Sequence, residues 1–148
     1  MIMLRSGIVV ALIVIGATLL PSYARAQATL QGFKMPSDNV YCMIEPGYQG
    51  HPDSDLRCDI VQTDTPPPPA PASCRFSWGK SFAIDLEGDG GTRLCVSDTT
   101  RDDELPVLSY GTQWSQGGYL CKSATSGLTC SNVKAHGFVL SKEAQSLF

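Results

Sequence analysis

Cys130 and His136 lie close together in the stretch SGLTCSNVKAHGFVLS, and a cysteine beside a histidine can act as a nucleophile with its base. The reactive species is the thiolate, so this chemistry requires Cys130 to be reduced. His136 could instead activate a serine, but no G-x-S-x-G motif marks a nucleophilic serine in the chain. Only His51 is present as a second histidine. We therefore expect no catalytic residue. A hydrolase that uses His136 is less favoured than the two non-catalytic functions given at the end of this section.

Metal-binding motifs are also missing from the sequence. It contains no C-x-x-C and no H-E-x-x-H. Asp85, Glu87 and Asp89 alternate in DLEGDGG as they would at the start of a calcium loop, but Val96 stands where an EF-hand requires its last acidic ligand. We predict a tight hairpin turn here instead, with the glycines at 90 and 91 at positive φ. No metal site and no cofactor is expected.

Three aromatic residues in LSYGTQWSQGGY form a candidate binding surface together with His136: Tyr110, Trp114 and Tyr119. Exposed Tyr and Trp side chains often contact glycans or proteins, because they offer a large area at little cost in conformational entropy. Packing in the core is the commoner fate of such residues. Both interpretations remain open from the sequence.

The six cysteines predict three disulfides, because their number is even and an exported chain seldom keeps free thiols. Six cysteines allow about fifteen pairings. A faint internal repeat relates VYCMI…DLRCDI to YLCKS…GLTCSN, and each copy resembles a hairpin with one cysteine on each strand. This repeat favours sequential pairs, namely Cys42–Cys58, Cys74–Cys95 and Cys121–Cys130.

Apolar residues recur with the period of two that is typical of strands. Leu56, Cys58 and Ile60 fall on one face of a strand, with Arg57 and Asp59 on the other. Similar alternation, broken by Gly, Pro, Asn and Asp, occurs at 81–86, 127–132 and 136–141. We predict an all-β fold, a small antiparallel sandwich or barrel of short hairpins cross-linked by disulfides. Only residues 141–148 suggest a short C-terminal helix, with the serine at 141 as its N-cap.

The first 26 residues have the pattern of a secretory signal peptide. Arg5 precedes an apolar run over residues 8–20, and Ala24 and Ala26 provide the small residues of a cleavage site. A membrane anchor is the alternative, but a spanning helix needs about 20 apolar residues and this run ends before Pro21. We therefore expect cleavage after Ala26, a secreted or periplasmic location and no membrane insertion of the mature protein.

Residues 27–148 suffice for a single β domain. Removing the two arginines of the signal changes the net charge from −3 to −5, which disfavours binding to nucleic acid. The run TPPPPAPA at 65–72 predicts a stiff, extended connection. A linker between two domains is disfavoured, because residues 27–64 are too few to form a core. A PxxP ligand motif is possible in form, but most readers of such motifs are intracellular.

The chain resembles a family of small exported bacterial proteins, from actinobacteria and some proteobacteria, classed only as a domain of unknown function. The resemblance rests on PSDNVYC, LRCDI, SWGKSFAIDL, CVSDT, LSYG, CKSATSGLTCSN and HGFVLSKE. The chain departs from that pattern in a longer Pro-rich stretch and in Ser109, where proline is expected. The resemblance implies an exported single domain and carries no activity.

Together these features favour an exported, non-catalytic binding or envelope-associated domain. Its expected partner is a protein or a glycan of the cell envelope. The alternative is an inhibitor of an envelope or host hydrolase, because rigid loops lower the entropic cost of binding and acidity steers a protein towards basic enzymes.

Overall fold

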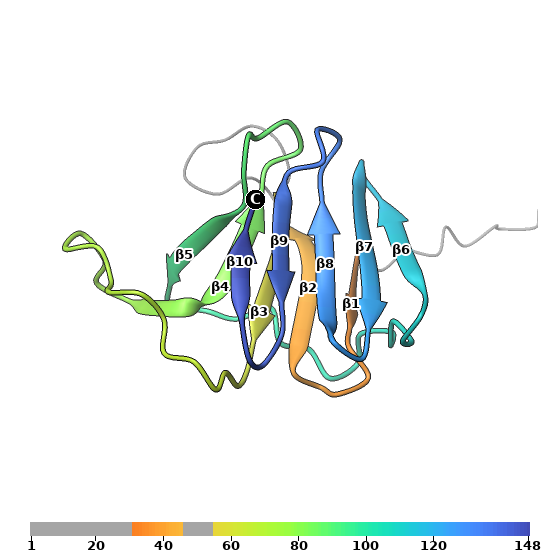
Figure 1. Cartoon of the computed structure of the whole chain (residues 1–148), viewed down its shortest axis with the longest axis horizontal. Coiled ribbons are helices and arrows are strands. Elements are labelled where there is room, and N and C mark those ends of the chain that lie inside the picture. The colour runs from red at the N-terminus through yellow and green to blue at the C-terminus, as the bar shows by residue number, and fades with distance from the viewer. Residues whose placement is uncertain (1–30, 46–54) are drawn as a thin grey trace, which may run out of the picture.

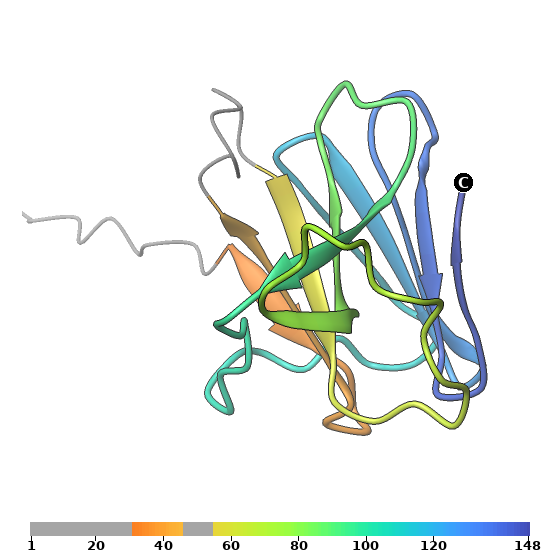
Figure 2. The same cartoon turned by 90° about the vertical axis from the view of Figure 1, so that its left-hand side faces the viewer.

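The computed structural model describes residues 31–45 and 55–148, and all regular structure in this part of the chain is β-strand. The first sheet contains, in spatial order, β1 (Gly32–Lys34), β2 (Val40–Glu45), β3 (Asp55–Ile60), β4 (Ser77–Ile84) and β5 (Thr92–Val96). The second contains β10 (Gln145–Leu147), β9 (Gly137–Leu140), β8 (Gly127–Ser131), β7 (Tyr119–Ala124) and β6 (Gln113–Gln116). Both sheets are antiparallel and stack face to face (Figures 1 and 2). The all-β prediction is confirmed, as a sandwich rather than a barrel. The predicted signal peptide lies outside the described residues.

The core is built from one matching row of side chains in each sheet. In the first sheet, strand pairing aligns Phe33, Cys42, Cys58 and Phe82 across β1 to β4. In the second, it aligns Trp114, Cys121, Cys130 and Phe138 across β6 to β9. The outer aromatic rings meet across the interface, Phe33 with Trp114 at 5.2 Å and Phe82 with Phe138 at 6.0 Å between centroids. The two copies of the sequence repeat therefore pack against each other.

All three predicted disulfides are present: Cys42–Cys58, Cys74–Cys95 and Cys121–Cys130. Two of them lie in the middle of the facing rows and are fully buried. The sulfurs of Cys42, Cys58 and Cys130 lie within 4.8 Å of one another, but each is bonded in a disulfide and offers no thiolate to a metal or a substrate. Each bridge is expected to contribute about 2–4 kcal/mol, mainly by restricting the unfolded chain.

The outer face of the first sheet is buried as well. Every residue of β3 is buried, including Arg57 and Asp59, which the alternation had placed on the face opposite the core. The connection from β5 to β6 covers this face and is anchored by Thr100, whose hydroxyl donates to the carbonyl of Tyr41 and whose N–H donates to Asp59. Further along the connection, the N–H of Lys34 donates to the carbonyl of Pro106.

The predicted C-terminal helix is wrong, because residues 141–148 turn back and form β10 against β9. Ser141 does accept a hydrogen bond from the N–H of Ala144, as an N-cap would. The backbone N–H of Ser141 also donates to the carbonyl of Ala144, which closes a hairpin turn. A helix of eight residues is marginal by itself, so pairing with β9 prevails over the local signal.

The β4–β5 hairpin forms as predicted, but its glycines act differently from expectation. Neither Gly90 nor Gly91 is among the residues at positive φ. Gly91 is required by close packing, since a Cβ there would lie 2.3 Å from the carbonyl oxygen of Gly137. Among the described residues, no helix is long and apolar enough to span a membrane.

Candidate binding site

A cavity of about 310 Å³, which we call the end cavity, opens between the two sheets at one end of the sandwich. The β1–β2, β7–β8 and β9–β10 turns that line it lie at the lower end of the sandwich in Figure 1. Its walls come from the β1–β2 connection, the β7–β8 turn and the β9–β10 turn, together with Val61 and Gln62 after β3. Tyr110, from the connection before β6, completes the lining. Both sheets thus contribute to one concave site, which is the usual place for a small ligand.

The floor of the cavity is apolar and its rim is polar. Met35, Val40 and Leu140 are buried beneath it, with exposed fractions of 3%, 4% and 0%. The rim carries exposed hydroxyl, amide and carboxylate groups, from Ser37, Gln62, Thr125, Ser126 and Glu143. A floor that packs against carbon and a rim that forms hydrogen bonds suit a ligand with both kinds of surface.

Two contacts hold the rim in place. The side chain of Asn39 donates to the carbonyl of Gln62 at 3.0 Å and accepts from its N–H at 2.8 Å, which joins the β1–β2 connection to the end of β3. Asp38 adopts a left-handed φ of 51° and forms an ion pair with Lys34 at 2.8 Å. The hydrogen bond to Asp38 raises the pKa of Lys34. These contacts preorganise one wall of the cavity.

Most charge around the cavity is already paired. Asp38 is bound to Lys34, and Lys142 pairs with Asp64 at 3.2 Å. The carboxylate of Glu143, by contrast, has no hydrogen bond or ion pair to any residue the structure describes. The rim therefore presents neutral polar groups and one unpaired negative charge, which favours a neutral or weakly cationic ligand over an anion.

The four residues predicted for a binding surface do not come together. Tyr110 lies at the cavity and is 40% exposed. Trp114 is partly buried and packs on the core, and Tyr119 is buried with an exposed fraction of 1%. Tyr119 therefore belongs to the core and not to a surface. His136 lies in the β8–β9 turn, at the opposite end of these strands from the cavity.

His136 sits in a turn that is organised by Asn132, a residue the sequence did not single out. The buried Asn132 amide donates to the carbonyls of Asp85 and Gly88, at 2.9 and 2.7 Å. Its oxygen accepts from the N–H groups of Lys134 and His136, both at 3.0 Å. Asn132 thus joins the β4–β5 and β8–β9 turns, and His136 takes part through its backbone.

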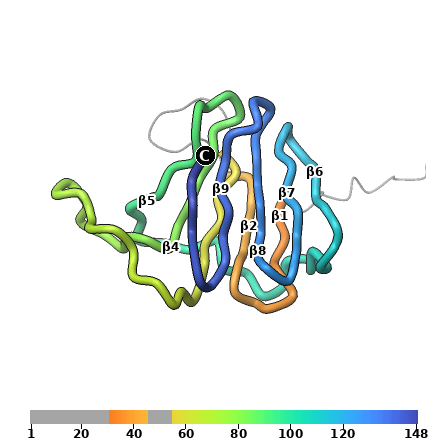
Figure 3. The backbone as a smooth tube through the Cα atoms, in the orientation of Figure 1, coloured from red at the N-terminus to blue at the C-terminus, as the bar shows by residue number. Residues whose placement is uncertain are grey.

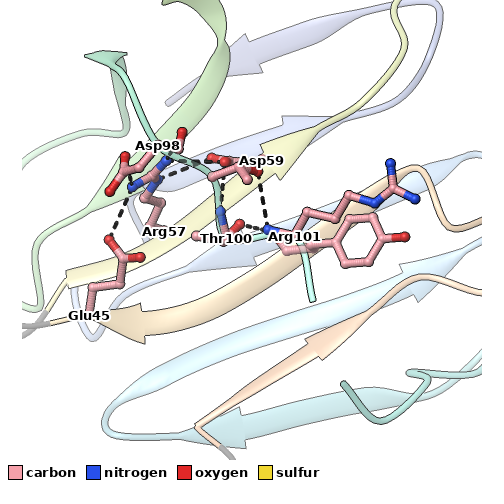
Figure 4. A network of polar contacts seen from close by, with 8 residues as sticks. Glu45, Arg57, Asp59, Asp98, Thr100 and Arg101 are labelled. Carbon is pink, nitrogen blue, oxygen red and sulfur yellow. Dashed lines mark hydrogen bonds and ion pairs between the residues drawn. The ribbon is translucent and has the colours of Figure 1, made fainter. Parts of the chain in front are cut away.

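A buried ion network on the outer face of the first sheet, centred on Arg57, was not predicted from the sequence (Figure 4). Arg57 donates two parallel hydrogen bonds to Asp59, both at 3.1 Å, and further bonds to Glu45 and Asp98, at 3.3 and 3.0 Å. Burial opposes the charge of Arg57, but these carboxylates outweigh it and raise its pKa. A hollow of about 220 Å³ lies beside this network. This hollow is smaller than the cavity at the end of the sandwich and is lined only by the first sheet and its connections, so the end cavity is the better site for a small ligand.

Comparison with known proteins identifies the family and adds no activity. No curated protein and no solved structure matches the chain. One family model, described as a family of unknown function, DUF6636, matches residues 11–148. This match covers nearly the whole chain, including all six cysteines and every strand that the structure describes. The chain belongs to the family of unknown function DUF6636.

Proposed function

We propose that the protein is an exported, non-catalytic binding domain that holds a glycan of the cell envelope in the end cavity. The observation that carries this proposal is the combination of a buried apolar floor with an exposed rim of hydroxyl and amide groups and Tyr110. A sugar ring has apolar C–H faces and hydroxyl edges, so it can stack on an aromatic ring while the rim binds its hydroxyls.

Export is supported by the signal-like N-terminus and by the three disulfides. Disulfides persist in oxidising compartments such as the periplasm and the extracellular space. A non-catalytic role is supported by the state of Cys130, the candidate nucleophile near His136. Cys130 is oxidised, and it lies in the core away from solvent.

The test is a binding measurement by NMR chemical-shift perturbation with soluble neutral oligosaccharides of the kinds found in cell envelopes. Shifts should concentrate on the turns around the cavity, and Tyr110→Ala should weaken binding at least about 5-fold through loss of the stacking surface. Val133→Ala is the matched control, since Val133 is 60% exposed in the β8–β9 turn at the other end of the sandwich. Shifts spread over other faces, or unchanged affinity in Tyr110→Ala, would contradict the proposal.

A further inference from the structure

The proline-rich segment between β3 and β4 forms an ordered arm that projects beyond the edge of the two sheets (Figures 1 and 3). We define the proline arm as residues 65–76. All its residues are exposed except Cys74, which is half-buried. Near its end, Phe76 is 64% exposed, the highest exposure among the large hydrophobic side chains of the described residues. Because the arm is exposed, it contributes little to the hydrophobic core. Its fixed conformation therefore suggests a function other than stabilising the fold.

The base and middle of the arm are held by specific contacts. At the base, the N–H of Asp64 donates to the carbonyl of Lys142 at 2.7 Å, and the hydroxyl of Thr65 donates to the carbonyl of Glu143. In the middle, the indole N–H of Trp78 donates to the carbonyl of Pro68 at 2.9 Å. The ring of Pro67 packs directly on Gly79, where a Cβ would lie 2.4 Å from it. The arm is therefore rigid before it meets any partner.

The backbone around Phe76 is fixed on both sides. On one side, Cys74 is bonded to Cys95 in β5, and its sulfur lies 3.4 Å from the carbonyl oxygen of Phe76. This contact is not a hydrogen bond, because an oxidised sulfur carries no proton. On the other side, Ser77 pairs with Val96 in the sheet. One large apolar side chain thus stands out from a short, immobilised stretch of chain with polar neighbours.

We propose that the proline arm inserts Phe76 into the specificity pocket of a serine endopeptidase that prefers large apolar residues, and thereby inhibits it. Phe76 lies where the arm rejoins the sheet, directly before β4, and the exposed chain on its N-terminal side belongs to no strand. That chain can therefore lie in the active-site cleft of an endopeptidase, which binds extended chain. A single aromatic anchor on a rigid backbone binds with little entropic cost. The disulfide beside Phe76 would hold the two ends together if the bond after it were cut, so the complex would outlast cleavage. This activity uses residues separate from the end cavity and stands independently of glycan binding.

The test uses the whole oxidised domain, residues 27–148, against chymotrypsin and subtilisin, which accept large apolar residues, with trypsin for comparison. We expect competitive inhibition of the first two enzymes. Phe76→Ala should weaken it at least about 30-fold, the loss typical of a central interface anchor. Phe76→Arg should transfer inhibition to trypsin, because only the residue in the pocket has changed.

Val133→Ala, in the β8–β9 turn and outside the arm, is the matched control and should alter inhibition of chymotrypsin by less than about 3-fold. Because Phe76 and Val133 are both exposed, these variants should fold, which unchanged thermal unfolding would verify. Tyr110→Ala, in the end cavity, separates the two proposed sites. The proposal is overturned if the domain fails to inhibit chymotrypsin and subtilisin at micromolar concentration, or if the bond after Phe76 is simply hydrolysed as in a substrate. It is also overturned if Phe76→Ala inhibits as well as the original chain. Loss of inhibition only in Tyr110→Ala would point to the end cavity instead.

Discussion

Replacing Arg57 with methionine should destabilise the domain more than any change to its exposed ion pairs. Methionine fills a similar volume but leaves Asp59 without its two parallel hydrogen bonds, at a side chain that is only 8% exposed. Removing one partner of a buried ion pair costs about 3–5 kcal/mol in the free energy of unfolding. The remaining partners add little, because Glu45 is 29% and Asp98 is 73% exposed.

The assay is equilibrium unfolding in urea with the disulfides kept oxidised. With a denaturant slope of about 1–3 kcal/mol per molar, a loss of about 3 kcal/mol should lower the midpoint by roughly 1–3 M urea. Asp98→Asn is the matched control for the exposed side of the network and should cost about 1 kcal/mol or less. The double variant Arg57→Met with Asp59→Asn should regain part of the loss, because no buried charge then remains unpaired and the asparagine oxygen can still accept from the N–H of Thr100.

Two results would refute this reasoning. If Arg57→Met unfolds at the same urea concentration as the original chain, the pair contributes nothing beyond the space it fills. If the double variant is as unstable as Arg57→Met alone, the loss comes from shape or from anchoring of the β5–β6 connection, and not from an uncompensated Asp59.

Two further predictions concern residues that join distant segments. Asn132→Ala should cost about 2–3 kcal/mol in urea unfolding, because it removes four hydrogen bonds of a buried amide, whereas Lys134→Ala in the same turn should cost well under 1 kcal/mol. Burial, and then the hydrogen bond to Asp103, raise the pKa of Tyr41 above its ordinary value of 10.0. The neutral phenol therefore stabilises the fold below pH 10, and this contribution is lost as the pH rises through the folded-state pKa. A spectrophotometric titration should show a late tyrosinate component that disappears in Tyr41→Phe, and its persistence in that variant would rule out Tyr41 as the source.

The strands and disulfides could be predicted because their signals are local. The alternation of Leu56, Cys58 and Ile60 fixes which side chains face inward, and a strand pair with one cysteine on each strand brings the two sulfurs together. The same logic applies to Cys121 and Cys130, so the faint repeat gave the pairing of both hairpins.

The burial of Arg57 could not be predicted, because its cover comes from a distant polar segment. The sequence SDTTRDDELP has the composition of a solvent-exposed connection, and nothing in it indicates that Thr100 would dock on Tyr41 and Asp59. A strand whose second face is covered by a loop has the same alternation as one whose second face meets water. The error at the C-terminus has the same origin, since the Ser141 signal serves a helix cap and a hairpin turn equally well.

The candidate sites could be predicted only in part, because their residues also come from segments that are far apart in the sequence. Tyr110 was recognisable as an aromatic residue in a Gly-rich connection, but its neighbours in the cavity come from segments near residues 37, 62, 126 and 143. No spacing along the chain links these segments, because the ends of two stacked sheets bring them together. The aromatic residues that resembled Tyr110 in sequence had another role, since Trp114 and Tyr119 pack in or on the core.

The position of the third disulfide connects stability to function. The bridges of the two facing rows lie in the core, and each links two neighbouring strands of one sheet. Cys74–Cys95 instead lies outside the core and ties the proline arm to β5. It restrains the backbone on either side of Phe76. Cys74–Cys95 restricts the unfolded chain as the other two bridges do, and in the folded protein it also fixes the position of one exposed aromatic side chain, as the proposed recognition by a rigid anchor requires.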